Sequence, residues 1–293
     1  MKKIAIAAAT GNIGSSVARQ ISAHGATTLL LGQNLKRLED LNIDGGLARV
    51  ADISNTEEVI AATEGAEALL WLVPPVLDKP GLSEWYKKVT DAGIAAVKQN
   101  KIKRVVLISS LGASTTPNLG TVSYCGAMEV AFDELDASVV ALRPGYFMEN
   151  FILQAKDITE KGTFAFPFDS DHDIPFITAD DIAEAATRYL LDETWAGHWK
   201  LNLMGPENIT LAQAASRLSA LIGNPVKYVQ QSGEEVKAQL SSWGVSKRVE
   251  QELMDLFAAL GDPNGAYATP RTIEASTATT FEEFIVQKLL PLL

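Results

Sequence analysis

The sequence predicts an α/β fold built on a doubly wound parallel sheet, followed by a smaller C-terminal part with both helices and strands. Short runs rich in β-forming residues alternate with amphipathic helical stretches as far as residue 143. Most of these runs are almost continuously apolar, which is typical of parallel strands covered on both faces. After Pro144 the alternation stops. A chain of 293 residues is long enough for one large α/β unit or for a core domain with a smaller appendage.

Candidate strands of this sheet occur throughout the first half of the chain. They are Lys3–Ala7, Thr27–Leu31, Ala48–Val50, Ala68–Val73, Arg104–Ser109 and Ser138–Leu142. Helical patterns lie between them, the clearest at Ile13–His24 and Leu82–Gln99. Because crossovers between parallel strands are almost always right-handed, this alternation predicts a doubly wound sheet with helices on both faces.

The residues after Pro144 follow a different pattern. A turn-rich stretch over residues 164–175 carries Asp169, Asp171 and Asp173, and a helix begins near Thr178, which can cap its free N–H groups. Further predicted elements are strands at Trp199–Leu203 and Val226–Val229, and helices at Leu211–Ile222, Glu234–Leu240, Ser246–Leu260 and Thr280–Leu290. We therefore expect a sheet domain over residues 1–150 and a smaller part over residues 151–293. The second part is expected to pack on the first and to form the outer wall of a cleft at the carboxyl ends of the strands.

The composition is that of an ordinary globular protein. Apolar residues make up 47% of the chain and charged residues 21%, which argues against disorder. The formal net charge of -11 repels polyanions, and the sequence contains no dense run of Lys or Arg. We therefore expect no direct binding to nucleic acid. No segment approaches the roughly 20 apolar residues that span a bilayer, so no membrane insertion is expected.

Cysteine and histidine usage indicates neither disulfides nor a metal site. Cys125 is the single cysteine, which excludes an internal disulfide and a cysteine-based zinc site and fits a reducing cytoplasm. The histidines, His24, His172 and His198, are scattered without the spacing of metal ligands. The apolar run at Ile4–Ala9 is too short for a secretory signal, and we interpret it as part of the first strand.

The junction between the first strand and the first helix has the spacing of a phosphate-binding loop. In a G-x-x-G-x-x-G pattern, Ala8 takes the first glycine position, and Gly11 and Gly14 take the others. Glycine is needed there because the backbone turns tightly and approaches phosphates without a Cβ in the way. The N–H groups of the following helix then face a diphosphate, helped by the helix dipole. We predict that a dinucleotide binds Thr10, Gly11, Asn12, Ile13 and Gly14; the alternative is a plain strand-to-helix turn.

The residues after the second strand favour NADP over NAD. An acidic residue there would bind the ribose hydroxyls of NAD and repel a 2′-phosphate, and none is present. Gln33 can donate to a phosphate, and Lys36 or Arg37 can reach it. A solvated Lys-Arg pair on a helix is the alternative interpretation of those two charges. Asp52, after the third strand, either accepts from the adenine amino group or caps a helix that begins near Ser54.

Several motifs together make the chain resemble a known family over nearly its whole length. They are AATGNIG at residues 8–14, LVPP at 72–75, VVLISSLGA at 105–113, RPGYFMEN at 143–150, Asp180-Asp181-Ile182 and Gly205-Pro206-Glu207. The chain resembles the NmrA-like branch of the atypical short-chain dehydrogenase/reductases. This family includes NAD(P)H-dependent quinone and triphenylmethane-dye reductases and redox-sensing regulators.

The resemblance implies where a nicotinamide ring would lie. It would cross the carboxyl edge of the sheet, between Val73-Pro74 and the turn from Pro144 to Phe147, with Ser109 and Ser110 on the floor. The further cofactor-binding residues are Ile53, Leu72, Val73, Pro74, Ser109, Pro144, Tyr146 and Phe147. Simple stiffening of loops is the alternative role of the prolines.

The Tyr-x-x-x-Lys pair that reductases of the wider superfamily use is missing from this chain. In that pair the tyrosine gives a proton to the substrate, while the lysine lowers its pKa and holds the ribose. Tyr124 is followed four residues later by Met128, which cannot replace the lysine. If Glu129 is aligned with the helix glutamate usual in the family, the tyrosine position becomes Thr121 and the lysine position becomes Cys125. The catalytic residues therefore stay unassigned.

A substrate that accepts hydride readily does not need the missing pair. A quinone or a conjugated dye can take its proton from water, and catalysis is then mostly orientation in a dry apolar cleft. Tyr124, Tyr146, Phe147 and Phe168 can supply flat apolar walls, although each can equally be a core residue. The flanking residues offer Cys125 no positive charge, so we expect an inert thiol.

We therefore predict an NAD(P)H-dependent oxidoreductase that passes hydride to a quinone-like or extended aromatic acceptor, with NADP preferred. The alternative is a non-catalytic sensor that binds NAD(P) and signals through a protein partner. The missing pair favours the sensor, and an apolar cleft with a separate C-terminal wall favours the enzyme. A sugar-nucleotide epimerase or dehydratase, which also needs the Tyr-Lys pair, is the weakest alternative. A homodimer is a further expectation.

Overall fold

A single parallel sheet forms the centre of the molecule. The computed structural model describes residues 2–74 and 76–293, so Pro75 of the LVPP motif lies outside the described residues. Within these ranges seven strands pair in the order β10-β6-β5-β4-β1-β2-β3. All of the pairs are parallel. The strands are β1 (Lys3–Ile6), β2 (Thr27–Gly32), β3 (Gly46–Val50), β4 (Ala68–Leu72), β5 (Arg104–Ile108), β6 (Ser138–Pro144) and β10 (His198–Leu203).

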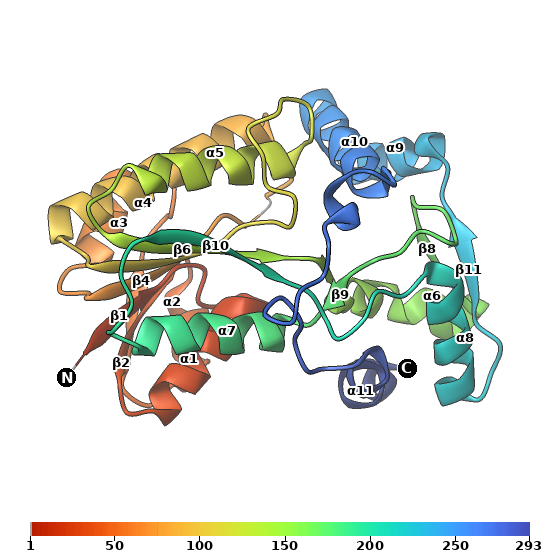
Figure 1. The fold of residues 1–293 in the computed structure, drawn as a ribbon, viewed down its shortest axis with the longest axis horizontal. Coiled ribbons are helices and arrows are strands. Elements are labelled where there is room, and N and C mark those ends of the chain that lie inside the picture. The colour runs from red at the N-terminus through yellow and green to blue at the C-terminus, as the bar shows by residue number, and fades with distance from the viewer. Residues whose placement is uncertain (1, 75) are drawn as a thin grey trace.

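Helices cover both faces of this sheet. Figure 1 shows α3 (Thr56–Ala62), α4 (Leu82–Asn100) and α5 (Thr121–Asp133) on one face, and α1 (Asn12–Ala23) and α7 (Ala179–Leu191) on the other. The short helix α2 (Leu35–Glu39) follows β2. Successive side chains of a strand point to opposite faces, so Ala5 and Ala7 pack under α4 while Ile4 and Ile6 pack under α1. The doubly wound Rossmann-type sheet predicted from the apolar runs is therefore confirmed.

Two elements that follow residue 150 return to the large sheet. Strand β10 pairs with β6 along its whole length, and helix α7 packs against α1. Ser16 of α1 donates to the Asp180 carboxylate of α7 at 2.8 Å. The strand at Trp199–Leu203 was expected in the C-terminal part, but it is an edge strand of the main sheet. Two side chains of β10 are exposed, as is typical of an edge strand. The sequence did not predict this position in the sheet. The division at residue 150 itself stays a prediction.

The remaining C-terminal elements gather at one end of the sheet, opposite the N-terminus (Figure 1). Two short parallel pairs form there, β8 (Thr163–Phe166) with β11 (Lys227–Gln230) and β7 (Tyr146–Phe147) with β9 (Phe176–Ile177). The helices are η1 (Met148–Gln154), α6 (Ala155–Lys161), α8 (Leu211–Ile222), α9 (Gly233–Ser242), α10 (Lys247–Gly261), η2 (Ala266–Ala268) and α11 (Phe281–Phe284). The helix predicted at Thr280–Leu290 continues after α11 as a π-helical turn, η3 (Ile285–Leu289), and a 3-10 turn, η4 (Leu290–Leu292).

Helix α10 fastens the C-terminal part to the sheet domain. The Glu252 carboxylate accepts from the backbone N–H groups of Leu82 and Ser83, at 2.6 and 3.1 Å, and so caps α4. The Tyr124 hydroxyl of α5 donates to the same carboxylate at 2.9 Å. One acidic side chain therefore binds α4 and α5 to α10.

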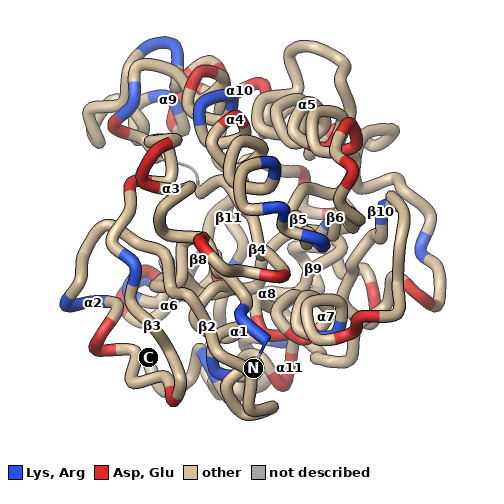
Figure 2. Tube along the Cα trace, turned by 90° about the vertical axis from the view of Figure 1, so that its left-hand side faces the viewer, with Lys and Arg blue, Asp and Glu red and all other residues tan. Residues whose placement is uncertain are grey.

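The surface charges are mixed (Figure 2), and the described residues include neither a membrane-spanning helix nor a metal cluster. Figure 2 shows Lys and Arg interspersed with Asp and Glu on the face it presents. Among the described residues, no helix has the length and apolarity to cross a membrane, and no group of three or more His, Cys, Asp or Glu side chains could hold a metal ion.

The contact between α4 and β4 supplies a test of core packing. Trp71 is fully buried, and a Cβ added at Gly93 would lie 2.5 Å from its Cε2 atom. We predict that Gly93→Ala lowers the free energy of unfolding by about 2 kcal/mol, because overpacking outweighs the gain in helix propensity. Urea denaturation measures the change. Combining Gly93→Ala with Trp71→Phe should reduce the loss of stability, because phenylalanine is smaller than tryptophan. A double-mutant cycle that shows no coupling between the two positions would contradict the contact as the cause of the loss.

Candidate functional site

The turn between β1 and α1 has the geometry of a phosphate-binding loop. Ala7 N–H donates to the Leu70 carbonyl at 3.1 Å and Ala9 N–H to the Leu31 carbonyl at 3.0 Å, which anchors the turn to both neighbouring strands. Ala8 adopts a left-handed backbone with φ of 49°. Glycine adopts this region without strain, so the structure explains why the pattern has a glycine at this position and shows alanine in the same conformation.

Gly14 lets the start of α1 press against this turn. A Cβ at Gly14 would lie 2.4 Å from the Ala8 carbonyl oxygen, and one at Gly11 would lie 3.3 Å from the same atom. Helix α1 begins at a Gly11 cap with no side-chain cap hydrogen bond and has no acidic residue in its first turn. Its first N–H groups and its positive dipole end are therefore open to an anion such as a diphosphate.

A cavity of about 370 Å³ extends from this loop across the carboxyl ends of the strands. Its walls come from the loop, the ends of β4 and β5, the starts of α4 and α5, and the turn after β6. The lining residues are Ala8, Gly11, Asn12, Ile13, Gly14, Leu72, Val73, Pro74, Tyr86, Ile108, Ser109, Ser110, Thr121, Cys125, Pro144, Gly145 and Phe147. Most of the predicted nicotinamide-side residues and both positions of the missing pair are in this set.

The predicted adenosine-side residues lie outside the lining and follow strands β2 and β3. Asp52 accepts from Ser54 N–H at 2.9 Å and from Ser54 Oγ at 2.8 Å. Burial works against its ionisation, but these hydrogen bonds, with Lys79 and a bond from Gln33, hold the pKa of Asp52 below its usual range. The cap of α3 is Asn55, whose side chain accepts from the first-turn N–H groups, so Asp52 shapes the turn before the helix.

Three further predicted cofactor residues outside the lining are Thr10, Ile53 and Arg37. Thr10 is in the loop, and Ile53 is a buried residue beside Asp52. Arg37 is exposed in the first turn of α2, where its N–H donates to the Asn34 cap at 3.1 Å. The Nζ atom of Lys36 lies 3.6 Å from the Asp40 carboxylate and forms a salt bridge with it.

A buried charge network lies beneath the cavity floor. The Ser109 hydroxyl donates to the Glu129 carboxylate, which also accepts two bonds from Arg143, at 2.9 and 2.6 Å. Glu129 is only 2% exposed, so its charge is satisfied by these partners in place of water. Burial, together with the Glu129 carboxylate, raises the pKa of the Cys125 thiol to about 12. This shift agrees with an inert thiol.

Tyr86 and Ile108 line the cavity but were not predicted as site residues from the sequence. Tyr86 is the polar one of the two. It comes from α4 and is 6% exposed, and burial raises the pKa of its hydroxyl well above the ordinary value. Its ring meets that of Tyr124 with centroids 5.6 Å apart. Within the helix, Tyr86 follows the buried Leu82 by four residues and precedes the buried Val89 by three. This spacing is that of any core residue on the buried face, so it carried no signal of a site.

Three of the predicted substrate aromatics do not belong to the lining. Tyr124 faces Glu252 of α10. Tyr146 points into the C-terminal core, where its ring meets those of Phe166 and Phe168 edge-on at 5.4 and 5.7 Å. Phe168 is 1% exposed within the same cluster. Of the predicted aromatics Phe147 alone lines the cavity, and the pleat of β7 explains why its neighbour Tyr146 points elsewhere.

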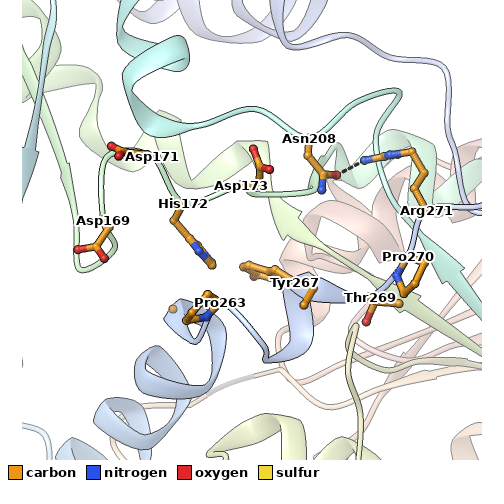
Figure 3. Close-up of a pocket in the computed structure, with 12 residues that line it drawn as sticks. Asp169, Asp171, His172, Asp173, Asn208, Pro263, Tyr267, Thr269, Pro270 and Arg271 are labelled. Carbon is orange, nitrogen blue, oxygen red and sulfur yellow. Dashed lines mark hydrogen bonds between the residues drawn. The ribbon is translucent and has the colours of Figure 1, made fainter.

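A second cavity, of about 590 Å³, lies in the C-terminal part (Figure 3). The aspartates of the turn-rich stretch line it, and His172 and Tyr267 face each other with ring centroids 6.1 Å apart. Its one arginine, Arg271, is occupied by Asn208 and a backbone carbonyl. This cavity shares no described lining residue with the loop cavity, which is the candidate functional site.

The fold and the loop define a Rossmann-type dinucleotide-binding protein. The chain matches the NmrA-like family over residues 1–285 and belongs to this family, whose members include NAD(P)H-binding oxidoreductases. It is 27% identical to the NAD(P)H azoreductase of Xenophilus azovorans over 286 residues, which cover 96% of each chain.

Solved structures of the same fold include an enzyme and a regulator. The NADPH-dependent quinone oxidoreductase QOR2 of Escherichia coli, solved with NADPH, gives a TM-score of 0.76 at 24% identity over 98% of this chain and 99% of that one. The negative transcriptional regulator NmrA, solved with NAD, gives a TM-score of 0.76 at 18% identity over 99% of this chain and 96% of that one. These structures share the fold, and the match over residues 1–285 confirms the predicted family.

The left-handed Ala8 supplies a test of the loop geometry. Relief of the left-handed backbone is worth roughly 1–2 kcal/mol, and the added freedom of glycine in the unfolded chain costs about 0.4–1 kcal/mol. We predict that Ala8→Gly raises the free energy of unfolding by up to about 1 kcal/mol. The matched variant Ala9→Gly changes a buried alanine outside the left-handed region and should lower stability by about 1 kcal/mol. Equal losses in urea denaturation would contradict the prediction.

Proposed function

We propose that this protein is an NAD(P)H-dependent oxidoreductase that transfers hydride to a quinone-like, azo or other extended aromatic acceptor. The observation that carries the proposal is the continuity of one cavity, from open helix N–H groups at Gly11 to the carboxyl ends of β4, β5 and β6. The Xenophilus azovorans relative is named as an NAD(P)H azoreductase. The Escherichia coli structure is that of an NADPH-dependent quinone oxidoreductase.

The residues present fit a dinucleotide. The first turn of α1, with Thr10 and Asn12 beside it, would hold the diphosphate, and Asp52 with Ile53 would contact the adenine. Leu72, Val73 and Pro74 would hold one side of the nicotinamide, with Ser109 below it and Pro144 and Phe147 opposite. Bound NAD(P)H supplies the hydride, so the chain itself needs only to orient the acceptor and keep water out.

The polarity of the cavity suits such an acceptor. Its exposed lining is mainly apolar, from Ile13, Leu72, Val73, Ile108 and Phe147. A flat conjugated molecule gains contact area against such walls, and its electron-poor π system delocalises the electron pair that hydride brings, without a metal or a strong acid.

A redox-sensing regulator is the second candidate. With Glu129 aligned to the helix glutamate of the family, Thr121 and Cys125 stand at the positions of the tyrosine and the lysine, and the raised pKa of Cys125 keeps its thiol protonated. A sensor would need a protein partner or a second copy of the chain, whereas the enzyme needs only its small-molecule acceptor. The cytoplasm, where reduced NAD(P)H is abundant, is the compartment we propose for either role.

Turnover separates the two candidates. We expect the protein to consume NADPH or NADH with at least one acceptor in a panel of quinones, azo dyes and triphenylmethane dyes, followed by absorbance. Asn12→Asp should weaken cofactor binding at least tenfold, because a carboxylate faces the diphosphate, and should keep the melting temperature, because an acidic first turn favours a helix. Asn55→Asp makes the same change at the cap of α3 and should leave binding unchanged. Tight cofactor binding without any turnover would favour the sensor.

Cofactor choice depends on Gln33 in our proposal, with NADP preferred. A carboxylate at this position would repel the 2′-phosphate and accept from the ribose hydroxyls of NAD. We predict that Gln33→Asp shifts the ratio of dissociation constants toward NADH at least tenfold, as measured by calorimetry. Asn34→Asp adds the same charge one residue later, at the cap of α2, and should shift the ratio less. Equal ratios in the wild type and in Gln33→Asp would refute the assignment.

A further inference from the structure

We propose that the cavity of about 590 Å³ in the C-terminal part binds a small organic cation that carries an aromatic ring. The ligand class is a protonated amine on a short chain attached to a ring, as in an arylalkylamine. The inference is independent of the proposed oxidoreductase function, because this cavity shares no described lining residue with the loop cavity. It assigns a further ligand to the chain.

Two segments that lie far apart in the chain form the walls of this cavity (Figure 3). One is the turn-rich stretch at residues 169–173, which supplies three aspartates and His172. The other runs over residues 261–271 and supplies Tyr267. Nε2 of His172 lies 2.8 Å from the Leu260 carbonyl oxygen, so this nitrogen carries the hydrogen and donates it. The bond joins the two walls at their meeting point and so fixes the separation between them.

The charge of the lining favours a cation. Among the described lining residues, three carboxylates, those of Asp169, Asp171 and Asp173, accompany one guanidinium, that of Arg271. The guanidinium donates to the Asn208 side chain and to a backbone carbonyl, so neutral acceptors engage it. The excess of negative charge attracts a cation and repels an anion.

Asp173 is the carboxylate that is open to a ligand. Asp169 accepts from the Gln230 side chain at 2.8 Å, and Asp171 accepts from the Ser170 hydroxyl. The side chain of Asp173, in contrast, has no hydrogen bond or ion pair with any other described residue. It is exposed, so an ammonium group in the cavity can pair with it directly.

Tyr267 supplies an observation that is independent of the charge. Its side chain is only 6% exposed, yet its hydroxyl forms no hydrogen bond within the described part of the chain. The hydroxyl oxygen is also not among the side-chain atoms there that are sealed from solvent without a partner. It therefore opens on the cavity that Tyr267 lines. Because buried polar groups are normally hydrogen-bonded, this hydroxyl lacks a partner that an N–H group of a ligand would supply.

The rings of the cavity suit a flat ligand with a positive end. The ring of His172 meets those of Phe168 and Tyr267, with a centroid separation of 6.1 Å in both pairs. Pro263 and Pro270 add apolar surface to the lining. An aromatic ring of the ligand gains contact area against these walls, and an ammonium group is attracted to the face of a tyrosine ring.

The arrangement of the carboxylates favours an organic cation over a metal ion. No group of three or more His, Cys, Asp or Glu side chains within the described ranges could hold a metal ion. The aspartates of the cavity are therefore spread around a space instead of converging on one point. A volume of about 590 Å³ is also that of a site for a small molecule.

The test compares three ligands of matched length on the full chain at pH 7 by calorimetry. They are 2-phenylethylamine, which is protonated at this pH, 2-phenylethanol and 3-phenylpropionate. We expect the amine to bind about tenfold more tightly than the alcohol, and the carboxylate to show no binding. The amine should bind equally well in the presence of NADPH. Absence of amine binding, equal affinities for amine and alcohol, or displacement of the amine by NADPH overturns the proposal.

Two variants test whether the amine occupies this cavity. We expect Asp173→Asn to weaken amine binding about tenfold, because the ion pair is lost, and to leave the affinity for the alcohol unchanged. Tyr267→Phe keeps the ring and removes the hydroxyl, and should weaken amine binding about threefold. Its melting temperature should equal that of the wild type, because the hydroxyl has no partner to lose. Asp44→Asn makes the same change of charge at an exposed residue outside the lining and should leave amine binding unchanged.

The outcomes for these variants support or overturn the proposal without reference to turnover. Amine binding that neither Asp173→Asn nor Tyr267→Phe weakens overturns it, because the amine then binds elsewhere. Equal weakening by Asp173→Asn and Asp44→Asn also overturns it, because net charge alone then explains the effect. None of these measurements uses a quinone or an azo dye, so failure of the cation site and failure of the oxidoreductase function are distinguishable.

Discussion

The contact between the start of α1 and the end of β1 is the constraint on which the candidate site depends. The missing Cβ of Gly14 lets the helix approach the Ala8 carbonyl more closely than any other residue would allow. The left-handed Ala8 turns the chain sharply enough to bring the helix in line with the strand. Because the turn is bonded to both β4 and β2, its N–H groups point in a fixed direction. An anion site is thus set by backbone geometry, and side chains only modify it.

The rest of the cavity follows from the parallel sheet. Carboxyl ends of parallel strands meet at one edge, so residues far apart in the chain, such as Val73, Ser109 and Pro144, come to lie around one space. The buried pairing of Glu129 with Arg143 joins α5 to β6 directly below that space. In a low-dielectric interior such a pair stays intact only when every partner is in place, so it holds the floor in one arrangement.

Sequence patterns predicted elements better than they predicted directions of side chains. Six strands of the main sheet were predicted, and most of them are apolar runs buried on both faces, which leave a strong signal. The edge strand β10 lacks that signal, so a strand was predicted there but its place in the main sheet was not. Tyr146 and Phe147 are neighbours in one motif, yet the pleat sends them to a core and to the cavity. Tyr86 could not be found, because a helix face that packs in a core and one that lines a cavity have the same spacing.

Loss of a motif is therefore a weak argument for loss of an activity. A sequence reveals a catalytic pair when both residues lie at a fixed spacing on one helix. Proton transfer itself depends on the position of the donor's hydrogen relative to the acceptor. Two helices pack side by side over this sheet, and either one can present a hydroxyl to the same point. Tyr86 of α4 lines the same cavity as Thr121 of α5, and no pattern along a single helix could have shown this.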